Sequence, residues 1–202
     1  AIELDPDNVE AYGYRCHLKY YLEDYEGVLE DCNKAIELDP TDGAYYNNRG
    51  VAKGNLDDDE GAIEDFTKAI ELDPTDGGHY NNRGLSKGYL EDHEGAIEDF
   101  TKAIELDPDN ADAYNYRGQA KYYLDDHEGA IEDLTKAIDI DPDNTEAYNF
   151  RGFVLFFIAE KEKKMDLFLK VIADFTRVIE LTPDHPQGYV NLAETKLEFK
   201  MY

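Results

Sequence analysis

Apolar residues recur along the chain with the spacing of amphipathic helices. Within residues 60–72 they occupy positions i, i+1, i+4, i+7 and i+8, which places them on one stripe of a helix with 3.6 residues per turn. These residues are Ala62, Ile63, Phe66, Ala69 and Ile70. A second amphipathic pattern covers residues 43–56. The pattern therefore predicts two short helices joined by a turn.

This pair of helices is repeated. The hexapeptide Ala-Ile-Glu-Leu-Asp-Pro returns every 34 residues, with small changes in its fifth copy, and a sixth version follows after 41 residues, so one repeat carries seven extra residues. The copies begin at Ala1, Ala35, Ala69, Ala103, Ala137 and Val178. One hairpin cannot bury its apolar stripe alone, so consecutive hairpins are expected to stack on one another.

Capping residues mark the helix ends. A side chain that accepts a backbone hydrogen bond follows each repeat's Pro by two residues and predicts the start of the first helix. These caps are Asn8, Asp42, Asp76, Asn110 and Asn144. Caps of the second helix are predicted at Asp58, Asp92 and Asp126, and its end at Pro40, Pro74, Pro108 and Pro142.

The residues that recur at fixed positions in each repeat resemble the signature of the tetratricopeptide-repeat family, which is aromatic, Gly, Ala, aromatic, Ala and Pro. The matching residues in one repeat are Tyr46, Gly50, Ala62, Phe66, Ala69 and Pro74. They recur as Tyr80, Gly84, Ala96, Phe100, Ala103 and Pro108, and as Tyr114, Gly118, Ala130, Leu134, Ala137 and Pro142. The resemblance covers nearly the whole chain and implies an all-α fold, an α-α superhelix in which antiparallel helix hairpins form a right-handed solenoid.

We expect one solenoid domain over residues 1–202. Its repeats are predicted at 7–40, 41–74, 75–108, 109–142 and 143–183, the last lengthened by about one turn on each helix. Residues 184–202 are predicted to form a C-terminal capping helix that ends near Leu197, Phe199 and Tyr202, and residues 1–6 to be the remnant of a preceding repeat. Because the chain begins without Met inside a motif, we interpret it as a fragment.

Each repeat has an Arg where the family usually has a large apolar residue, directly before the signature Gly or, in the first repeat, before Cys16. An Asp on the second helix accompanies each Arg. We predict that these residues form an ion pair within each hairpin, as a structural brace rather than a ligand site. The pairs are Arg15 with Asp31, Arg49 with Asp65, Arg83 with Asp99, Arg117 with Asp133 and Arg151 with Asp174.

The resemblance implies a concave groove lined by the first helices. One amide per repeat lies at a fixed position there, and a column of amides can bond the backbone of an extended peptide. This column is Asn47, Asn81, Asn115 and Asn149. The alternative is that these amides bond neighbouring helices and fix the stacking.

Aromatic side chains form further columns on the same helices. Rings give large contact areas at binding sites, and we expect a pocket walled by Tyr89, Tyr122 and Tyr123 where Gly54 and Gly88 leave space. The predicted groove residues besides the amides are Tyr89, Gln119, Tyr122, Tyr123, Phe153, Phe156 and Phe157. Alternatively, the rings only pack on the adjacent repeat. The cationic clamp with which some family members hold acidic tails is missing, since Asn48 and Asn82 stand among its positions.

Charge narrows the choice of partner. The chain has 20 Lys and Arg against 47 Asp and Glu, a formal net charge of −27. We therefore expect an acidic, soluble protein that binds neither nucleic acid nor membrane and whose protein or peptide partner is neutral or basic at the contact. Without a signal peptide or a membrane span, a cytoplasmic location is predicted, although targeting signals of a longer protein would not be visible.

No cluster of residues in the sequence predicts a catalytic or metal-binding site. Catalysis needs a singular site, and almost every feature is repeated, so we expect no enzyme activity, metal or cofactor. His93 and His127 are predicted to be solvated loop residues, and acidic turns such as residues 57–60 lack the spacing of a calcium loop. Cys16 and Cys32 are predicted to be buried and reduced, with a disulfide as the alternative.

The sequence thus favours a scaffold that binds a peptide segment of a partner protein in its concave groove. The alternative is a self-assembly module that oligomerises through the fifth repeat and the chain ends, where Phe153, Phe156 and Phe157 exceed what one helix can cover.

Overall fold

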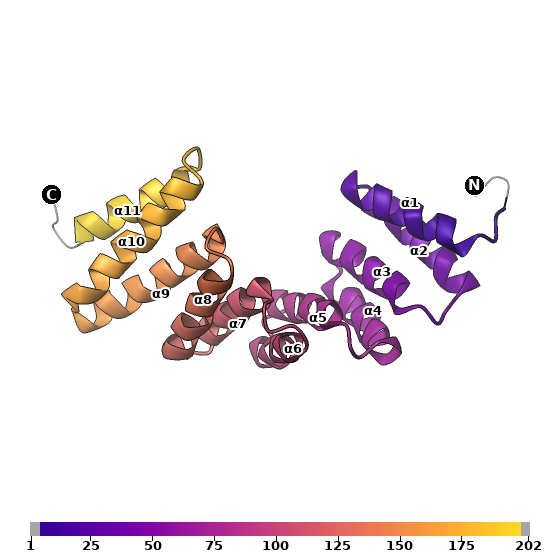
Figure 1. Ribbon diagram of the computed structural model, residues 1–202, viewed down its shortest axis with the longest axis horizontal. Helices are drawn as coiled ribbons and strands as arrows, with labels where there is room; N and C mark the ends of the chain where they lie inside the picture. Colours follow the sequence, from indigo (N-terminus) through magenta and orange to yellow (C-terminus); the bar gives the residue numbers. More distant parts are fainter. Residues whose placement is uncertain (1–4, 199–202) are drawn as a thin grey trace. The chain divides into compact units, whose positions relative to one another are not determined.

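The described part of the chain is all-helical. The computed structural model describes residues 5–198, and within this range it has eleven α-helices and no strand (Figure 1). The residues divide into two compact units, Ala1–Pro108 and Asp109–Tyr202, and each unit is described by itself. No helix within residues 5–198 is long and apolar enough to span a membrane.

The first unit consists of three antiparallel hairpins. Its helices are α1 (Val9–Tyr21), α2 (Tyr25–Leu38), α3 (Gly43–Asn55), α4 (Asp59–Leu72), α5 (Gly77–Tyr89) and α6 (His93–Leu106). Each odd-numbered helix packs on the helix that follows it, and each hairpin packs on the next through α2 against α3 and α4 against α5. The first helices also touch one another, α1 with α3 and α3 with α5.

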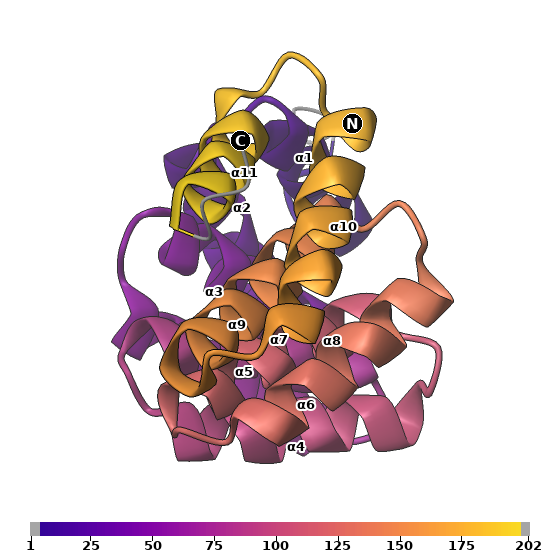
Figure 2. The ribbon, with the colours of Figure 1, turned by 90° about the vertical axis from the view of Figure 1, so that its left-hand side faces the viewer.

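The second unit continues the pattern with a lengthened hairpin. Its helices are α7 (Ala111–Tyr123), α8 (His127–Ile140), α9 (Thr145–Glu162), α10 (Met165–Leu181) and α11 (Pro186–Glu198). The insertion lengthens both helices of its hairpin, since α9 has 18 residues and α10 has 17, against 13 in α7 and 14 in α8. Figures 1 and 2 both show α11 beside α10, and the two helices are in contact. Phe199 and Tyr202 lie outside the described residues.

The predicted helix caps are confirmed. Asp42 Oδ1 accepts a hydrogen bond from the backbone N–H of Ala44, and Asp58 Oδ1 accepts one from Gly61. Asn and Asp cap the remaining helices of the regular hairpins in the same way, including Asp24 in front of α2, which the sequence analysis missed. The short polar side chains satisfy amide groups that the first turn leaves without helical partners.

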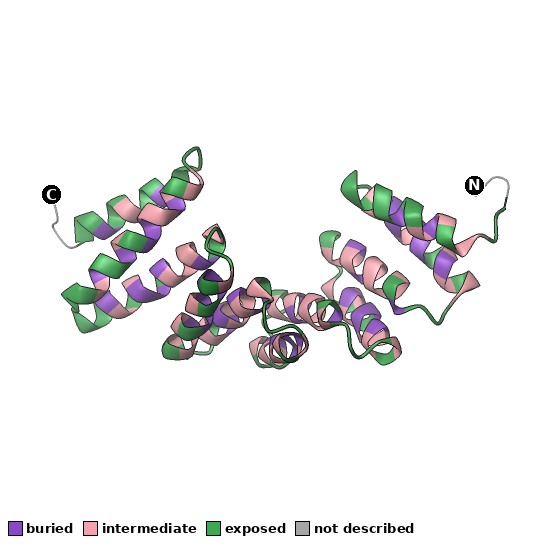
Figure 3. Cartoon of the chain, viewed as in Figure 1, coloured by how far each residue is buried: buried purple, intermediate pink, exposed green. Residues whose placement is uncertain are grey.

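Small residues allow the two helices of a hairpin to approach closely. A Cβ added to Gly50 would lie 2.7 Å from Cε1 of Phe66. Gly50 therefore leaves space for the ring of Phe66. Both Ala62 and Phe66 are buried, and Figure 3 shows buried positions alternating with exposed ones along the helices. This is the pattern that the apolar stripe predicted.

Candidate functional site

Every hairpin is bridged by the predicted Arg–Asp pair. In α5 and α6, Arg83 Nε donates to Asp99 Oδ2 at 2.9 Å and Arg83 NH2 donates to Oδ1 at 2.7 Å. The same two bonds join Arg15 to Asp31, Arg49 to Asp65, Arg117 to Asp133 and Arg151 to Asp174. Hydrogen bonding to Asp99 is the main influence that raises the pKa of Arg83, against the opposing effect of burial. The five predicted pairs are confirmed.

Each pair belongs to a larger network that the sequence analysis did not foresee. Lys87 Nζ lies 2.7 Å from Asp99 Oδ2, and the Arg83 guanidinium lies over the ring of Tyr80 at 5.8 Å. Arg83 NH1 also donates to Thr67 Oγ1 of the preceding hairpin at 3.1 Å. The groups of Arg83 that could hold a ligand are thus engaged with protein atoms, as a structural brace requires.

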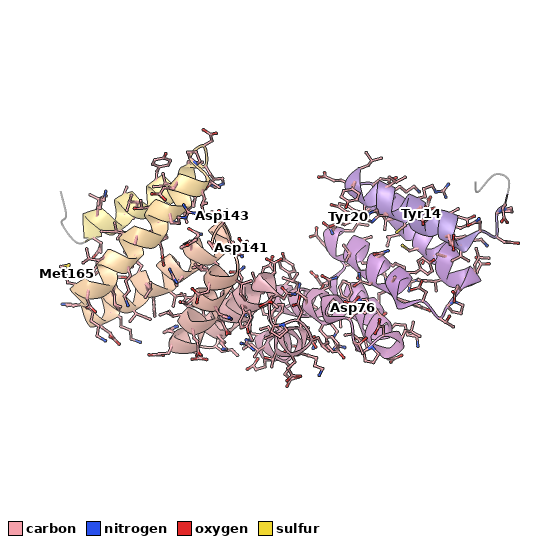
Figure 4. All side chains as sticks on the ribbon, viewed as in Figure 1. Tyr14, Tyr20, Asp76, Asp141, Asp143 and Met165 are labelled. Carbon is pink, nitrogen blue, oxygen red and sulfur yellow. The ribbon has the colours of Figure 1, made fainter. Side chains whose placement is uncertain are left out.

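Two cavities adjoin on the first helices of the first unit. The larger, of about 530 Å³, and the smaller, of about 300 Å³, share Tyr20, Val51 and Asn82 among their lining residues. These residues come from α1, α3 and α5 respectively, and Figure 4 shows Tyr20 at the end of α1 near α3. We call the joined cavities the first-unit groove. Ligand pockets have volumes of roughly 300–1,000 Å³, so the groove has room for part of a peptide.

The amide side chains that line the groove belong to the residues that directly follow the predicted ones in sequence. Asn48 and Asn82 line it, whereas Asn47 Oδ1 accepts a hydrogen bond of 3.0 Å from Asn82 Nδ2. The side chain of Asn48 has no hydrogen-bond partner among residues 5–198. Successive helical residues are about 100° apart around the axis, which explains why Asn48 rather than Asn47 faces the groove.

The remaining amides of the predicted column lie against protein. Asn149 Oδ1 accepts a hydrogen bond of 2.8 Å from Asn191 Nδ2 of α11. Asn115 is fully buried, with both polar atoms of its side chain lacking a partner in the described structure, and Asn81 Oδ1 is buried without one. Asn47 and Asn149 therefore bond neighbouring helices, which was the alternative to ligand binding. Ligand binding by this column stays a prediction.

The predicted aromatic residues separate into two environments. Tyr89 lines the larger cavity. Tyr122, by contrast, packs in the second unit against the rings of Phe150, Phe153 and Phe157, with centroids 5.6, 5.5 and 6.2 Å away. Burial is the main cause that raises its pKa.

The other predicted residues of the second unit also contact their neighbours. Tyr123 lies 6.5 Å from Phe150 between ring centroids, and Gln119 Nε2 donates to Glu146 Oε1 at 3.1 Å. Phe156 packs beside the cluster of Leu155, Val171 and Phe175. Tyr123 and Gln119 thus contact the adjacent repeat, whereas Phe156 packs within its own hairpin. A role of these side chains in ligand binding stays a prediction.

His93 and His127, which we predicted in loops, are the first residues of α6 and α8. His127 is the first residue of α8 and not a solvated loop residue, since its side chain is only 15% exposed. Its ring lies 5.3 Å from that of Tyr122 and 5.1 Å from that of Phe157. The sequence places an isolated His in a turn, and only the packing of α9 covers it.

The two cysteines are buried and free, as predicted. Their sulfur atoms are 2.7 Å apart, in α1 and α2. The contact with Cys16 and burial both raise the pKa of Cys32. Cys16 also lines the smaller cavity.

Comparison with known proteins agrees with the repeat. The family model described as TPR repeat matches residues 89–125, and the one described as Tetratricopeptide repeat matches residues 44–76 and 111–144. No curated protein matches the chain in sequence.

Solved structures are similar in fold. MamA from Desulfovibrio magneticus RS-1 is 21% identical, with 88% of this chain and 96% of that chain covered and a TM-score of 0.74. YrrB, a TPR protein with an unusual peptide-binding site, is 22% identical, with 94% of each chain covered and a TM-score of 0.71. PilF of Pseudomonas aeruginosa is 15% identical, with 95% of this chain and 84% of that chain covered and a TM-score of 0.82. At these identities the likeness shows the fold.

Proposed function

We propose that this chain, which belongs to the tetratricopeptide-repeat family, is a non-catalytic scaffold module that holds a peptide segment of a partner protein in the first-unit groove. The observation that carries the proposal is the groove itself, two cavities that share lining residues from three successive first helices. A continuous path across α1, α3 and α5 suits an extended segment better than a compact small molecule.

The chemistry of the walls supports a peptide. Asn48 offers a donor and an acceptor that no described group uses, and Asn82 keeps its Oδ1 acceptor while Nδ2 is bonded to Asn47. Val51 and Leu85 supply apolar surface beside these amides. Alternating amide and apolar contacts match the backbone and side chains of an extended chain. YrrB shows that a protein of this fold has a peptide-binding site.

A peptide library tests this function. Random dodecapeptides are selected on the purified chain, and the affinity of enriched peptides is measured by fluorescence anisotropy. Val51→Tyr fills the space common to both cavities and is expected to weaken binding at least tenfold. Asn48→Ala removes one hydrogen bond and is expected to weaken it roughly fivefold, about 1 kcal/mol.

The matched control is Glu64→Tyr, which adds the same ring at an exposed position of α4 outside the groove. It is expected to leave affinity unchanged. Thermal melting shows that each variant is folded. Failure to enrich any binding peptide, or equal affinity for the chain and Val51→Tyr, would rule out the groove as a peptide site.

A second candidate is self-assembly through the lengthened hairpin. Met165 and Leu169 of α10 are 59% and 63% exposed, and Figure 4 shows Met165 at the turn between α9 and α10. Exposed apolar side chains grouped on one element are typical of interfaces. Light scattering at high concentration is expected to give a mass above 23.1 kDa that Met165→Glu with Leu169→Glu returns to the monomer. A monomeric mass for the unaltered chain would eliminate this candidate.

A further inference from the structure

We propose that the larger cavity of the first-unit groove takes an arginine side chain of the bound peptide, paired with Asp59 and Ser86 and flanked by Tyr20 and Tyr89. The inference rests on the proposed function, and it specifies the chemistry of the segment that the groove selects.

The carboxylate of Asp59 faces the cavity without a counter-charge. Asp59 is the half-buried first residue of α4 and lines the cavity together with Asp57. A Cβ added to Gly54 would lie 3.9 Å from Asp59 Oδ1, so the carboxylate stands over the space that this glycine leaves. Within residues 5–198, Asp59 makes neither an ion pair nor a side-chain hydrogen bond.

A buried hydroxyl faces the same space. Ser86 is only 4% exposed, yet its Oγ has no hydrogen-bond partner among the described residues. The same Cβ on Gly54 would lie 3.8 Å from this oxygen. Ser86 Oγ and Asp59 Oδ1 are thus two hydrogen-bond acceptors that line one cavity and have no donor among the described residues.

Nearby cations do not supply that donor. Lys53 Nζ lies 2.8 Å from Asp65 Oδ2 and donates to the carbonyl oxygen of Gly61 at 3.1 Å. Lys87 Nζ lies 2.7 Å from Asp99 Oδ2. Both ammonium groups are thus held by the braces. The helices α3 and α5 also end at this side of the groove, and helix C-termini carry partial negative charge.

Aromatic rings complete the site. Tyr20 and Tyr89 line the cavity, and the Tyr89 ring is 76% exposed with no ring or cation partner in the described part of the chain. A guanidinium stacks on such rings while its fork of N–H donors reaches carboxylate and hydroxyl oxygens. A compact ammonium cannot use the rings and both oxygens equally well, so arginine fits better than lysine.

Asp59 and Ser86 differ from the residues at the equivalent positions of the other repeats. The positions equivalent to Asp59 hold Tyr25, His93 and His127, and those equivalent to Ser86 hold Ala52, Ala120 and Val154. The site therefore occurs once, because its carboxylate and hydroxyl meet only between α3 and α5.

The test compares an arginine with its neutral isostere. An enriched peptide, with Arg or citrulline at the same position, is titrated into the chain and into Asp59→Asn and Ser86→Ala. The chain is expected to prefer the arginine peptide by roughly tenfold, since hydrogen bonds to charged groups are strong. Asp59→Asn should remove that preference, and Ser86→Ala should reduce it about threefold. Glu64→Gln, an equal loss of charge on the exposed face of α4, should retain it.

Nuclear magnetic resonance locates the contact. N-acetylarginine amide is expected to shift the backbone amide signals of Gly54, Ser86 and Tyr89, and N-acetylcitrulline amide is not. Equal affinity for the two peptides, or an unchanged preference in Asp59→Asn, overturns the arginine site while Val51→Tyr still reports on the groove. If no peptide binds at all, the proposed function fails and the arginine site with it.

Discussion

Arg83 and Asp99 join α5 to α6 through two parallel hydrogen bonds, of 2.9 Å from Nε to Oδ2 and 2.7 Å from NH2 to Oδ1. Asp99 is 4% exposed, and its Oδ2 also forms an ion pair with Lys87 Nζ. Asp99→Ala leaves two cations without their buried partner, which is expected to lower the free energy of unfolding by about 3 kcal/mol. Urea denaturation measures this, with the exposed neighbour Glu98→Ala as control. A loss below about 1 kcal/mol would mean that solvent replaces the carboxylate.

The brace is expected to support the fold without touching the ligand. Arg83→Leu leaves Asp99 with Lys87 alone and should lower the melting temperature. The Arg83 side chain does not line either cavity, so enriched peptides should bind the folded variant with unchanged affinity. If folded Arg83→Leu loses peptide binding, the brace takes part in recognition.

The brace of the first hairpin makes stability depend on acid pH. Burial raises the pKa of Asp31, but hydrogen bonds from Arg15 and Lys19 outweigh it, and the pKa is lowered overall. A lowered folded-state pKa adds stability above the unfolded-state pKa, which is lost as the pH falls through the folded-state value. The stability difference between the chain and Asp31→Asn should therefore shrink as the pH is lowered from about 5 to 3. Urea unfolding at each pH, with exposed Glu30→Gln as control, measures it, and a constant difference would contradict this prediction.

Two glycines of α5 should respond oppositely to the same substitution. A Cβ on Gly84 would lie 2.8 Å from Cε1 of Phe100, whereas one on Gly88 meets nothing within 4 Å. Gly84→Ala is expected to destabilise by about 1–3 kcal/mol through overpacking. Gly88→Ala should stabilise by up to about 1 kcal/mol because alanine restricts the unfolded chain. Thermal melting compares the pair, and similar melting temperatures would show that the Phe100 ring moves aside.

The paired cysteines should form a disulfide when an oxidant is supplied. Cys16 Sγ and Cys32 Sγ are 2.7 Å apart and Cys16 lines the smaller cavity. Diamide, which accepts the two electrons and two protons of the thiols, is expected to join α1 to α2 within one chain. Mass spectrometry should show the loss of two hydrogens in the monomer, with Cys32→Ser as the control that cannot close the bond. An unchanged mass, with both thiols still free after treatment with diamide, would contradict this prediction.

The regular features could be predicted because they depend on residues close in sequence. Asp42 caps α3 through the backbone of Ala44, two residues away. The Arg49–Asp65 pair lies within one hairpin, sixteen residues apart, so the repeat register alone places it. Asp59 and Ser86 could have been singled out as departures from the repeat, but neither departure by itself indicates that the two face one cavity.

The sequence by itself determined the 34-residue hairpin, its caps and its braces, because each follows from local periodicity and repeats in register. Only the tertiary structure decided which side of a first helix faces the groove. Turning α3 about its axis by the angle between successive residues would place Asn47 instead of Asn48 in the groove. The packing of α1, α3 and α5 sets this orientation of α3. The same packing brings Ser86 and Asp59 together at Gly54, a contact between elements that no periodic pattern contains.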